Sequence, residues 1–174
     1  MMVAKINTIG CNSTCFCYSS GMKFLVLENI RSAYNVGAIF RTADATGVKK
    51  IFLVGYTPTP IDRFGRMQKE ISKTSLGASE EIEWEHSNDV RVVIEKLKTE
   101  KTTIVAIEQT KQSVSLATFK VPESVAYIMG NEVGGVSDEA LALSDVVVDL
   151  PMLGQKESLN VSVTAGVVLY HGLV

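Results

Sequence analysis

The chain is poor in cysteine and histidine and has no long apolar run. All three cysteines lie within residues 1–17 of the 174, and an odd number with no partner elsewhere excludes a disulfide scaffold. The longest apolar stretches, such as Val125 to Met129, are far shorter than the roughly 20 residues that cross a bilayer. Residues 1–21 also lack the apolar core of a secretory signal. These absences predict a cytoplasmic protein without a membrane span.

The cysteines form a C-x3-C-x-C cluster at Cys11, Cys15 and Cys17, within a polar segment that covers residues 1–22. Thiolate clusters bind zinc or iron–sulfur centres, but such sites usually need four ligands. We therefore expect a short, loosely packed leader that holds no metal ion. Met22 is an alternative natural start, because the first strand pattern follows it directly.

Residues 23–174 show one continuous α/β pattern with no linker, which predicts a single domain. The apolar runs lack strict alternation, as expected for strands buried on both faces of a mostly parallel sheet. The predicted strands are Phe24–Leu27, Ile51–Val54, Thr103–Ile107, Val125–Met129 and Val146–Leu150. The helices, expected on both faces of the sheet, are Val36–Thr46, Asn88–Glu100, Ser137–Leu143 and Ser158–Leu173, with Arg66–Ser75 as a further candidate.

Polar segments follow three of these strands, at the position where α/β sheets bind ligands. They are Asn29–Ala43, Tyr127–Ser137 and Leu150–Ser162. The glycines of the second segment match neither the P-loop nor G-x-G-x-x-G, so a triphosphate or a dinucleotide is disfavoured. A ligand without phosphate, held by backbone groups, fits better. In the first segment Arg41 offers a guanidinium fork to a phosphate or an oxyanion, although a lone arginine also serves as an ion-pair partner.

The three segments carry motifs in a fixed order along the chain. They read N-x-G-x-x-x-R-T-A at Asn35–Ala43, G-N-E-x-x-G at Gly130–Gly135 and L-P-M-x-G…S-L-N-V-S at Leu150–Ser162, and a K-T-S-L-G-A segment lies at Lys73–Ala78. From about Lys23 to its end, the chain therefore resembles the SpoU/TrmH-type RNA 2′-O-ribose methyltransferases of the SPOUT superfamily.

The resemblance implies a fold in which the C-terminal part forms a deep trefoil knot, a rare exception to un-knotted topology. It also implies a homodimer through the terminal helix, with Arg41 of one subunit near the cofactor of the other. The implied cofactor is S-adenosylmethionine, bound by backbone groups of three loops. The matching residues are Ile107, Glu108, Met129, Gly130, Leu150, Met152 and Leu159.

By the same resemblance, Arg41 activates the ribose 2′-hydroxyl. Because a guanidinium stays protonated, we expect Arg41 to stabilise the developing alkoxide and to hold the adjacent phosphate instead of acting as a base. The residues expected to place the ribose and hold Arg41 are Asn35, Glu132, Ser158 and Asn160.

The net charge of −2 is unevenly distributed along the chain. Residues 23–73 carry nine Lys and Arg against four Asp and Glu, whereas residues 74–174 carry seven against fifteen. We therefore expect RNA to contact the first of these stretches. The predicted RNA-binding residues are Arg31, Arg63, Arg66, Lys69 and Lys73.

The substrate class is less sharply indicated than the reaction. Minimal members of this kind most often resemble tRNA methyltransferases, which favours tRNA. A ribosomal RNA 2′-O-methyltransferase and a non-catalytic RNA-binding module on the same fold stay open as alternatives. A nicotinamide-dependent enzyme is disfavoured, because its glycine fingerprint is missing.

Overall fold

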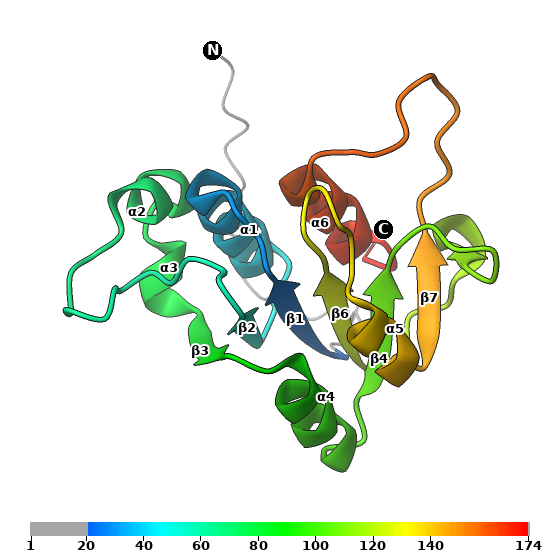
Figure 1. Ribbon diagram of the computed structural model, residues 1–174, viewed down its shortest axis with the longest axis horizontal. Helices are drawn as coiled ribbons and strands as arrows, with labels where there is room; N and C mark the ends of the chain where they lie inside the picture. Colours follow the sequence, from blue (N-terminus) through cyan, green and yellow to red (C-terminus); the bar gives the residue numbers. More distant parts are fainter. Residues whose placement is uncertain (1–20, 174) are drawn as a thin grey trace, which may run out of the picture.

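The computed structural model describes residues 21–173, which form a seven-stranded sheet in the order β3-β2-β1-β6-β4-β7-β5 (Figure 1). All six neighbouring pairs are parallel. The strands are β1 (Met22–Glu28), β2 (Lys50–Val54), β3 (Glu83–Ser87), β4 (Thr103–Ile107), β5 (Val114–Ser115), β6 (Ser124–Met129) and β7 (Val146–Asp149). The predicted α/β class with a mostly parallel sheet is confirmed. The cysteine cluster and nearly all of the predicted leader lie outside the described residues.

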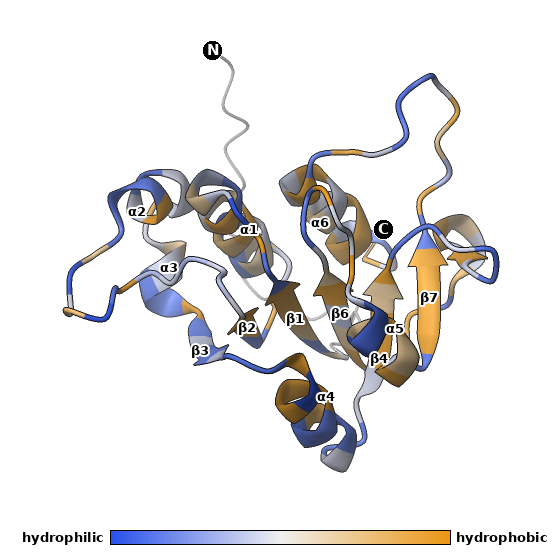
Figure 2. Ribbon diagram, in the orientation of Figure 1, coloured by the Kyte–Doolittle hydropathy of each residue, from blue (hydrophilic) through white to orange (hydrophobic). Residues whose placement is uncertain are grey.

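Helices cover both faces of the sheet, as predicted. Alternate side chains of β1 show the two layers, because Leu25 belongs to one apolar core and Val26 to the other. In Figure 2 the central strands are coloured as hydrophobic, and α2 and α4 show hydrophilic residues beside hydrophobic ones. One face is covered by α1 (Ala33–Ala45), α2 (Lys69–Ser75), α3 (Ala78–Glu81), the 3-10 helix η1 (Leu116–Thr118) and α6 (Val161–Tyr170), and the other by α4 (Val90–Thr99) and α5 (Asp138–Leu143).

The sequence pattern missed β3 and β5, which lie at the two edges of the sheet. Strand β3 reads EWEHS and has no apolar run because its charged side chains pair on the surface. The Lys50 ammonium lies 2.6 Å from Glu83 and 2.9 Å from Glu85, and Lys96 lies 2.7 Å from Glu85. Charged side chains along an exposed edge also discourage pairing with another strand.

The starts of α1 and α2 differ from the predictions. Helix α1 begins at Ala33 and not at Val36, because the Ser32 hydroxyl caps it by accepting a hydrogen bond from the backbone N–H of Asn35 at 3.3 Å. Helix α2 begins only at Lys69, so Arg63 and Arg66 lie in the preceding loop. The candidate helix Arg66–Ser75 is therefore confirmed only from Lys69 onward.

Helix α6 is shorter than predicted and has two different faces. It runs from Val161 to Tyr170 with Asn160 as its N-cap, so Ser158 precedes the helix and does not cap it. One face is buried in the core, whereas Val163, Val167 and Tyr170 are 50%, 45% and 43% exposed. Among the helices of residues 21–173, α6 included, none has the length and apolarity to cross a membrane.

Candidate functional site

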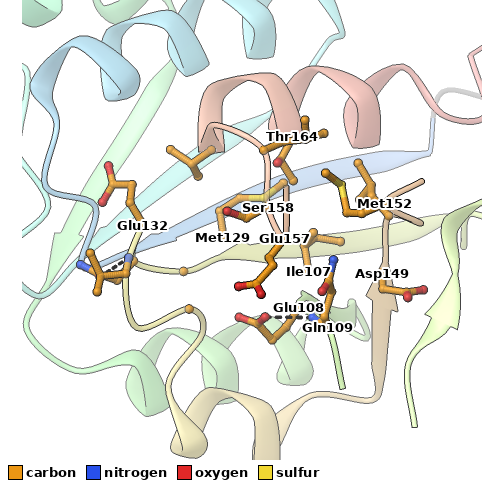
Figure 3. Close-up of a pocket in the computed structure, with 17 residues that line it drawn as sticks. Ile107, Glu108, Gln109, Met129, Glu132, Asp149, Met152, Glu157, Ser158 and Thr164 are labelled. Atoms are coloured by element: carbon orange, nitrogen blue, oxygen red, sulfur yellow. Dashed lines mark hydrogen bonds between the residues drawn. The ribbon is translucent and has the colours of Figure 1, made fainter. Parts of the chain in front are cut away.

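A cavity of about 320 Å³ lies at the carboxyl ends of the neighbouring strands β6, β4 and β7 (Figure 3). This volume is at the lower end of the roughly 300–1,000 Å³ that is typical of small-molecule sites. Each strand contributes its last residues and the loop that follows, as expected for a parallel sheet. The first turn of α6 closes one side through Val161 and Thr164.

All the residues predicted to bind a cofactor line this one cavity. They are Ile107, Glu108, Met129, Gly130, Leu150, Met152 and Leu159. Ser158 and Glu132, predicted for the ribose, line it as well. Further lining residues were not predicted: Gln109, Asn131, Val133, Gly135, Asp149, Glu157, Val161 and Thr164. Most of them are sequence neighbours of motif residues, and that adjacency was the signal that could have revealed them.

The loop after β6 depends on two glycines. A Cβ on Gly130 would collide with the backbone of Gly135 and Val136, so only glycine fits there. Gly135 has a φ of +70°, in the left-handed region that side chains avoid. Asn131 and Gly135 exchange two backbone hydrogen bonds of 2.9 Å, which close the loop into a tight turn. The turn brings backbone groups to the rim of the cavity.

The loop is held by a polar side chain of its own and by carboxylates at the ends of β1 and β4. The Asn131 side-chain oxygen accepts hydrogen bonds from the backbone N–H groups of Val133 at 2.8 Å and Gly134 at 2.9 Å. The Glu108 carboxylate accepts one from the N–H of Val136 at 3.0 Å. Buried Glu28, at the end of β1, accepts one from the Ser137 hydroxyl at 2.6 Å. Asn131 and Glu28, which hold the loop in place, were not among the predicted site residues.

The charge of the cavity has one sign. Its lining includes four carboxylates, Glu108, Glu132, Asp149 and Glu157, and no lysine, arginine or histidine. In Figure 3, Glu108 and Glu157 point toward the same part of the cavity. An acidic lining repels phosphate groups and favours a cationic or zwitterionic ligand.

A polar network beside the cavity joins three segments of the chain. The Glu132 carboxylate accepts hydrogen bonds from the backbone N–H groups of Arg31 at 3.1 Å and Ser32 at 3.4 Å. It also accepts one from the Asn35 side-chain amide at 3.2 Å, and the Asn35 oxygen accepts one from the Asn160 amide at 3.2 Å. Three of the predicted catalytic residues, Asn35, Glu132 and Asn160, are thus in direct contact.

The protonation state of Glu132 follows from these contacts. Partial burial raises the pKa of its carboxyl, but the hydrogen bonds from Arg31, Asn35 and Ser32 lower it more. The net result is a pKa below the ordinary value, so Glu132 is a carboxylate at neutral pH.

We expect the network to stabilise the protein only while Glu132 is ionised. Because its pKa is lower in the folded than in the unfolded state, this contribution is present above about pH 4.5 and is lost as the pH falls through the folded-state pKa. Chemical denaturation of the wild type and of Glu132→Gln should show a stability difference at pH 7 that shrinks in acid. A difference that does not change with pH would contradict the assigned ionisation.

Arg41 is separated from this network in its own chain. It is exposed on α1 and does not line the cavity, and within residues 21–173 no hydrogen bond or ion pair holds its guanidinium. Helix α1 packs beside α6, where a Cβ on Gly166 would lie 3.9 Å from Thr42. The expectation that Asn35, Glu132, Ser158 and Asn160 hold Arg41 is therefore not met within one chain.

The basic residues predicted for RNA lie around the loop between β2 and α2 and at the start of α1. Arg63 and Arg66 place their guanidinium carbons 4.8 Å and 4.9 Å from the ring centre of Phe64. Arg66 also pairs with Asp62 at 2.8 Å. Lys69 and Lys73 follow on α2 as exposed side chains. Exposed Arg31 lies just before α1, and its backbone N–H contacts Glu132.

A parallel sheet with a cavity at the carboxyl ends of its strands, beside a loop that contains glycines, is typical of an α/β protein with a small-molecule site. Sequence comparison gives the family. The chain belongs to the SpoU rRNA Methylase family, whose model matches residues 22–170.

Named relatives are similar over most of the chain. The 23S rRNA (guanosine-2'-O-)-methyltransferase RlmB of Neisseria meningitidis is 33% identical over 145 residues, which cover 83% of this chain and 55% of that protein. The tRNA (guanosine(18)-2'-O)-methyltransferase of Thermus thermophilus is 33% identical over 150 residues, which cover 84% of this chain and 72% of that protein. The AdoMet-bound rRNA methyltransferase of Sinorhizobium meliloti superimposes with a TM-score of 0.79 at 27% identity, over 88% of this chain and 56% of that one. The chain thus spans about half the length of the first and third proteins.

Proposed function

We propose that the chain transfers a methyl group from S-adenosylmethionine to a ribose 2′-hydroxyl of RNA, with residues 23–174 acting as one methyltransferase domain. The observation that carries this proposal is the convergence of two motif segments, Tyr127–Ser137 and Leu150–Ser162, on one acidic cavity at the end of β4, with Asn35 of the first segment bonded to Glu132 at its rim. The named relatives are methyltransferases, and one of them was solved with AdoMet bound, which supports the same chemistry here.

The cavity suits S-adenosylmethionine better than a phosphate-bearing cofactor. S-adenosylmethionine supplies an electrophilic methyl group on a sulfonium, and it also carries an ammonium group. The lining carboxylates complement these positive charges, whereas they would repel NAD or ATP. The apolar side chains of Leu150, Met152 and Leu159 would cover the adenine and exclude water.

In the proposed reaction this chain contributes positioning and charge. Asn35, Glu132, Ser158 and Asn160 would place the ribose. The Arg41 guanidinium would stabilise the negative charge that develops on the 2′-oxygen as its proton passes to water, while S-adenosylhomocysteine leaves as a neutral thioether. Neither histidine lines the cavity, and each is engaged elsewhere: His86 contacts the Gly55 carbonyl at 2.9 Å and His171 that of Phe119 at 2.8 Å. We therefore assign no histidine base.

Calorimetric titration tests the cofactor assignment. S-adenosylhomocysteine, the demethylated product, should bind with a micromolar Kd, and NAD should show no heat of binding. Binding of RNA without either nucleoside ligand would favour the alternative, a non-catalytic RNA-binding module. Binding of NAD would contradict the charge argument.

We propose tRNA as the substrate, with ribosomal RNA as the alternative. The similarity to the Thermus tRNA enzyme, which is 33% identical to this chain, supports tRNA. The Thermus and Neisseria relatives are both bacterial, which supports the cytoplasm as the place of action. Methylation of total tRNA and of 23S rRNA with a radiolabelled methyl donor, followed by mapping of ribose methylation, decides between the two substrates.

The RNA-binding surface is proposed to include Arg31, Arg63, Arg66, Lys69 and Lys73. If these residues contact phosphates, the logarithm of the RNA affinity falls linearly with the logarithm of the salt concentration. Replacing Arg63, Lys69 and Lys73 by Gln should make this slope shallower by about three. An unchanged slope would place the RNA elsewhere. Lys96, Lys98 and Lys101, at the end of α4 and just beyond it, provide a matched control triple.

We also propose a homodimer through α6, and a C-terminal trefoil knot as implied by the resemblance. The exposed apolar side chains of Val163, Val167 and Tyr170 support the interface. Because α1 lies beside α6, such a dimer would bring Arg41 close to the partner subunit, which explains its separation from the cavity of its own chain. Val163→Glu together with Val167→Glu should give a monomer in light scattering. A double variant that remains dimeric would contradict the proposed interface.

A further inference from the structure

A second hollow of about 570 Å³ lies between the loop that leads to α2 and the edge strand β3. We call it the aromatic groove, because Tyr56, Phe64, Trp84 and His86 are among its lining residues. Tyr56 is 61% exposed and Phe64 is 65% exposed. In Figure 1 this loop extends from the edge of the molecule next to β3, away from α6. Exposed rings gathered at one hollow indicate a binding surface.

The groove is held by local hydrogen bonds. Residues Ile61 and Met67 form an antiparallel bridge, which makes the loop a short hairpin. The Asp62 carboxylate accepts hydrogen bonds from the backbone N–H groups of Phe64 at 2.8 Å and Arg66 at 2.9 Å. The Phe64 ring is therefore presented at the hairpin tip before any ligand arrives, which reduces the ordering cost of binding.

The charges around the groove favour one kind of ligand. Arg63 and Arg66 flank the Phe64 ring, and Lys69 follows on α2. Aromatic rings beside cations are the pattern with which proteins bind single-stranded nucleic acid, because the rings stack on bases while the cations meet phosphates. A duplex keeps its base faces covered and cannot use such rings.

The aromatic groove also touches the loop that lines the cofactor cavity. The Asn131 side-chain amide donates a hydrogen bond of 2.6 Å to the Tyr56 hydroxyl and one of 2.8 Å to the Asn29 carbonyl. Asn131 lines the cavity, whereas Tyr56 lines the groove. One RNA strand could therefore occupy the groove while its ribose reaches the cavity.

We propose that the aromatic groove binds an unstacked base of the substrate RNA. This inference rests on the proposed function, because it assumes an RNA substrate. Tyr56 supplies a stacking ring to the base and, through its hydroxyl, contacts the cofactor loop.

Trp84 is the only tryptophan of the chain and lines the groove, so its fluorescence reports on occupancy. A single-stranded RNA heptamer should quench this emission to saturation. The same heptamer annealed to its complement should not. RNA affinity is measured in parallel by the anisotropy of a labelled heptamer, so that binding and groove occupancy are separated.

Paired variants separate the ring of Tyr56 from its hydroxyl. Tyr56→Leu should weaken single-strand binding about 5- to 150-fold, the range expected for one lost stacking contact. Tyr56→Phe keeps the ring and should bind the heptamer as tightly as the wild type does. Val92→Ala removes an exposed apolar side chain from α4, on the other side of the sheet, and should change neither signal.

The outcomes that overturn the proposal are distinct. Heptamer binding with unchanged Trp84 emission and an unaffected Tyr56→Leu variant would exclude the groove while leaving the proposed function intact. Equal quenching by the duplex would show that the groove recognises backbone charge and not a base. If the Trp84 emission per molecule changes with protein concentration in the absence of RNA, the groove is occupied by a second copy of this chain. If the wild type binds S-adenosylhomocysteine but no RNA, both the RNA substrate and the binding of a base in the aromatic groove are rejected.

Discussion

Arg41→Lys is expected to abolish nearly all methyl transfer while leaving the fold and cofactor binding unchanged. Arg41 is exposed on α1, and no hydrogen bond or ion pair within residues 21–173 depends on it, so its replacement costs little stability. Lysine keeps the charge but offers a single point donor in place of a planar fork. Loss of one preorganised oxyanion donor typically lowers kcat about 100- to 1,000-fold. Turnover on RNA and calorimetry with S-adenosylhomocysteine measure the two quantities separately.

Arg91→Lys is the matched control for this substitution. Arg91 lies on α4, on the face of the sheet opposite α1, where it pairs with Glu139 at 2.7 Å, and it does not line the cavity. We expect unchanged turnover, because a surface ion pair contributes little and lysine preserves it. Near-normal activity of Arg41→Lys would remove Arg41 from the reaction and strengthen the alternative of a binding module.

Gly130→Ala is expected to weaken cofactor binding about 100-fold without unfolding the sheet. A Cβ at this position would collide with the backbone of Gly135 and Val136, so the loop must move to accommodate it. Overpacking of this kind costs about 1 to 3 kcal/mol, and 2.8 kcal/mol corresponds to a 100-fold change in Kd. Calorimetry with S-adenosylhomocysteine gives the Kd, and the melting temperature shows whether the rest of the domain is intact.

The same loop supplies a control with identical chemistry. A Cβ on Gly134 would find only the Asn131 side-chain oxygen, at 3.8 Å, which is an ordinary contact. Gly134→Ala should therefore bind the cofactor as the wild type does. An equal loss of cofactor affinity in both variants would show that the loop tolerates no side chain at either position. It would contradict a clash that is specific to Gly130.

The two variants together test whether the site is shared between subunits. Each variant alone should have lost most of its activity when the concentration of S-adenosylmethionine lies below the raised Kd of Gly130→Ala. In a mixed dimer, the Gly130→Ala subunit supplies a native Arg41 to the intact cavity of the other subunit, so random mixing should restore about a quarter of the wild-type activity. No recovery after exchange of subunits would show that Arg41 acts within its own chain.

The sequence predicted the interior of the sheet well and its edges poorly, for one physical reason. Strands β1 and β6 are buried on both faces and must be apolar, so their runs stand out. Strand β3 has a partner on one side only and tolerates the alternating charges of Glu83 and Glu85. The candidate helix Arg66–Ser75 begins only at Lys69, because Ile61 and Met67 pair as an antiparallel bridge and keep Arg66 in a hairpin.

The candidate site also contains some residues that could be predicted from the sequence and others that could not. Met129 and Leu150, at the ends of predicted strands, were expected to bind a cofactor because of the resemblance to a known family, and the structure brings them to one cavity. Asn131 and Glu28 were missed as loop supports, because their partners cannot be inferred from spacing. Glu28 reaches Ser137 across 109 positions, and no local pattern encodes such a distance. The roles of Arg41 in catalysis and of Gly130 in cofactor binding remain predictions that the variants above test.

The strand order has a consequence for how the protein is made. Strand β1 pairs with β6, and Asn35 contacts Asn160 across 125 positions. During synthesis β1 therefore cannot pair with β6 until most of the chain has been made. The hydrogen bond between Asn35 and Asn160 forms later still, because Asn160 follows β6 in the sequence. Such distant pairing slows folding. Newly made chains should thus pass through a sheet with an open edge at β1, when aggregation competes most strongly and bound S-adenosylmethionine cannot yet stabilise the fold.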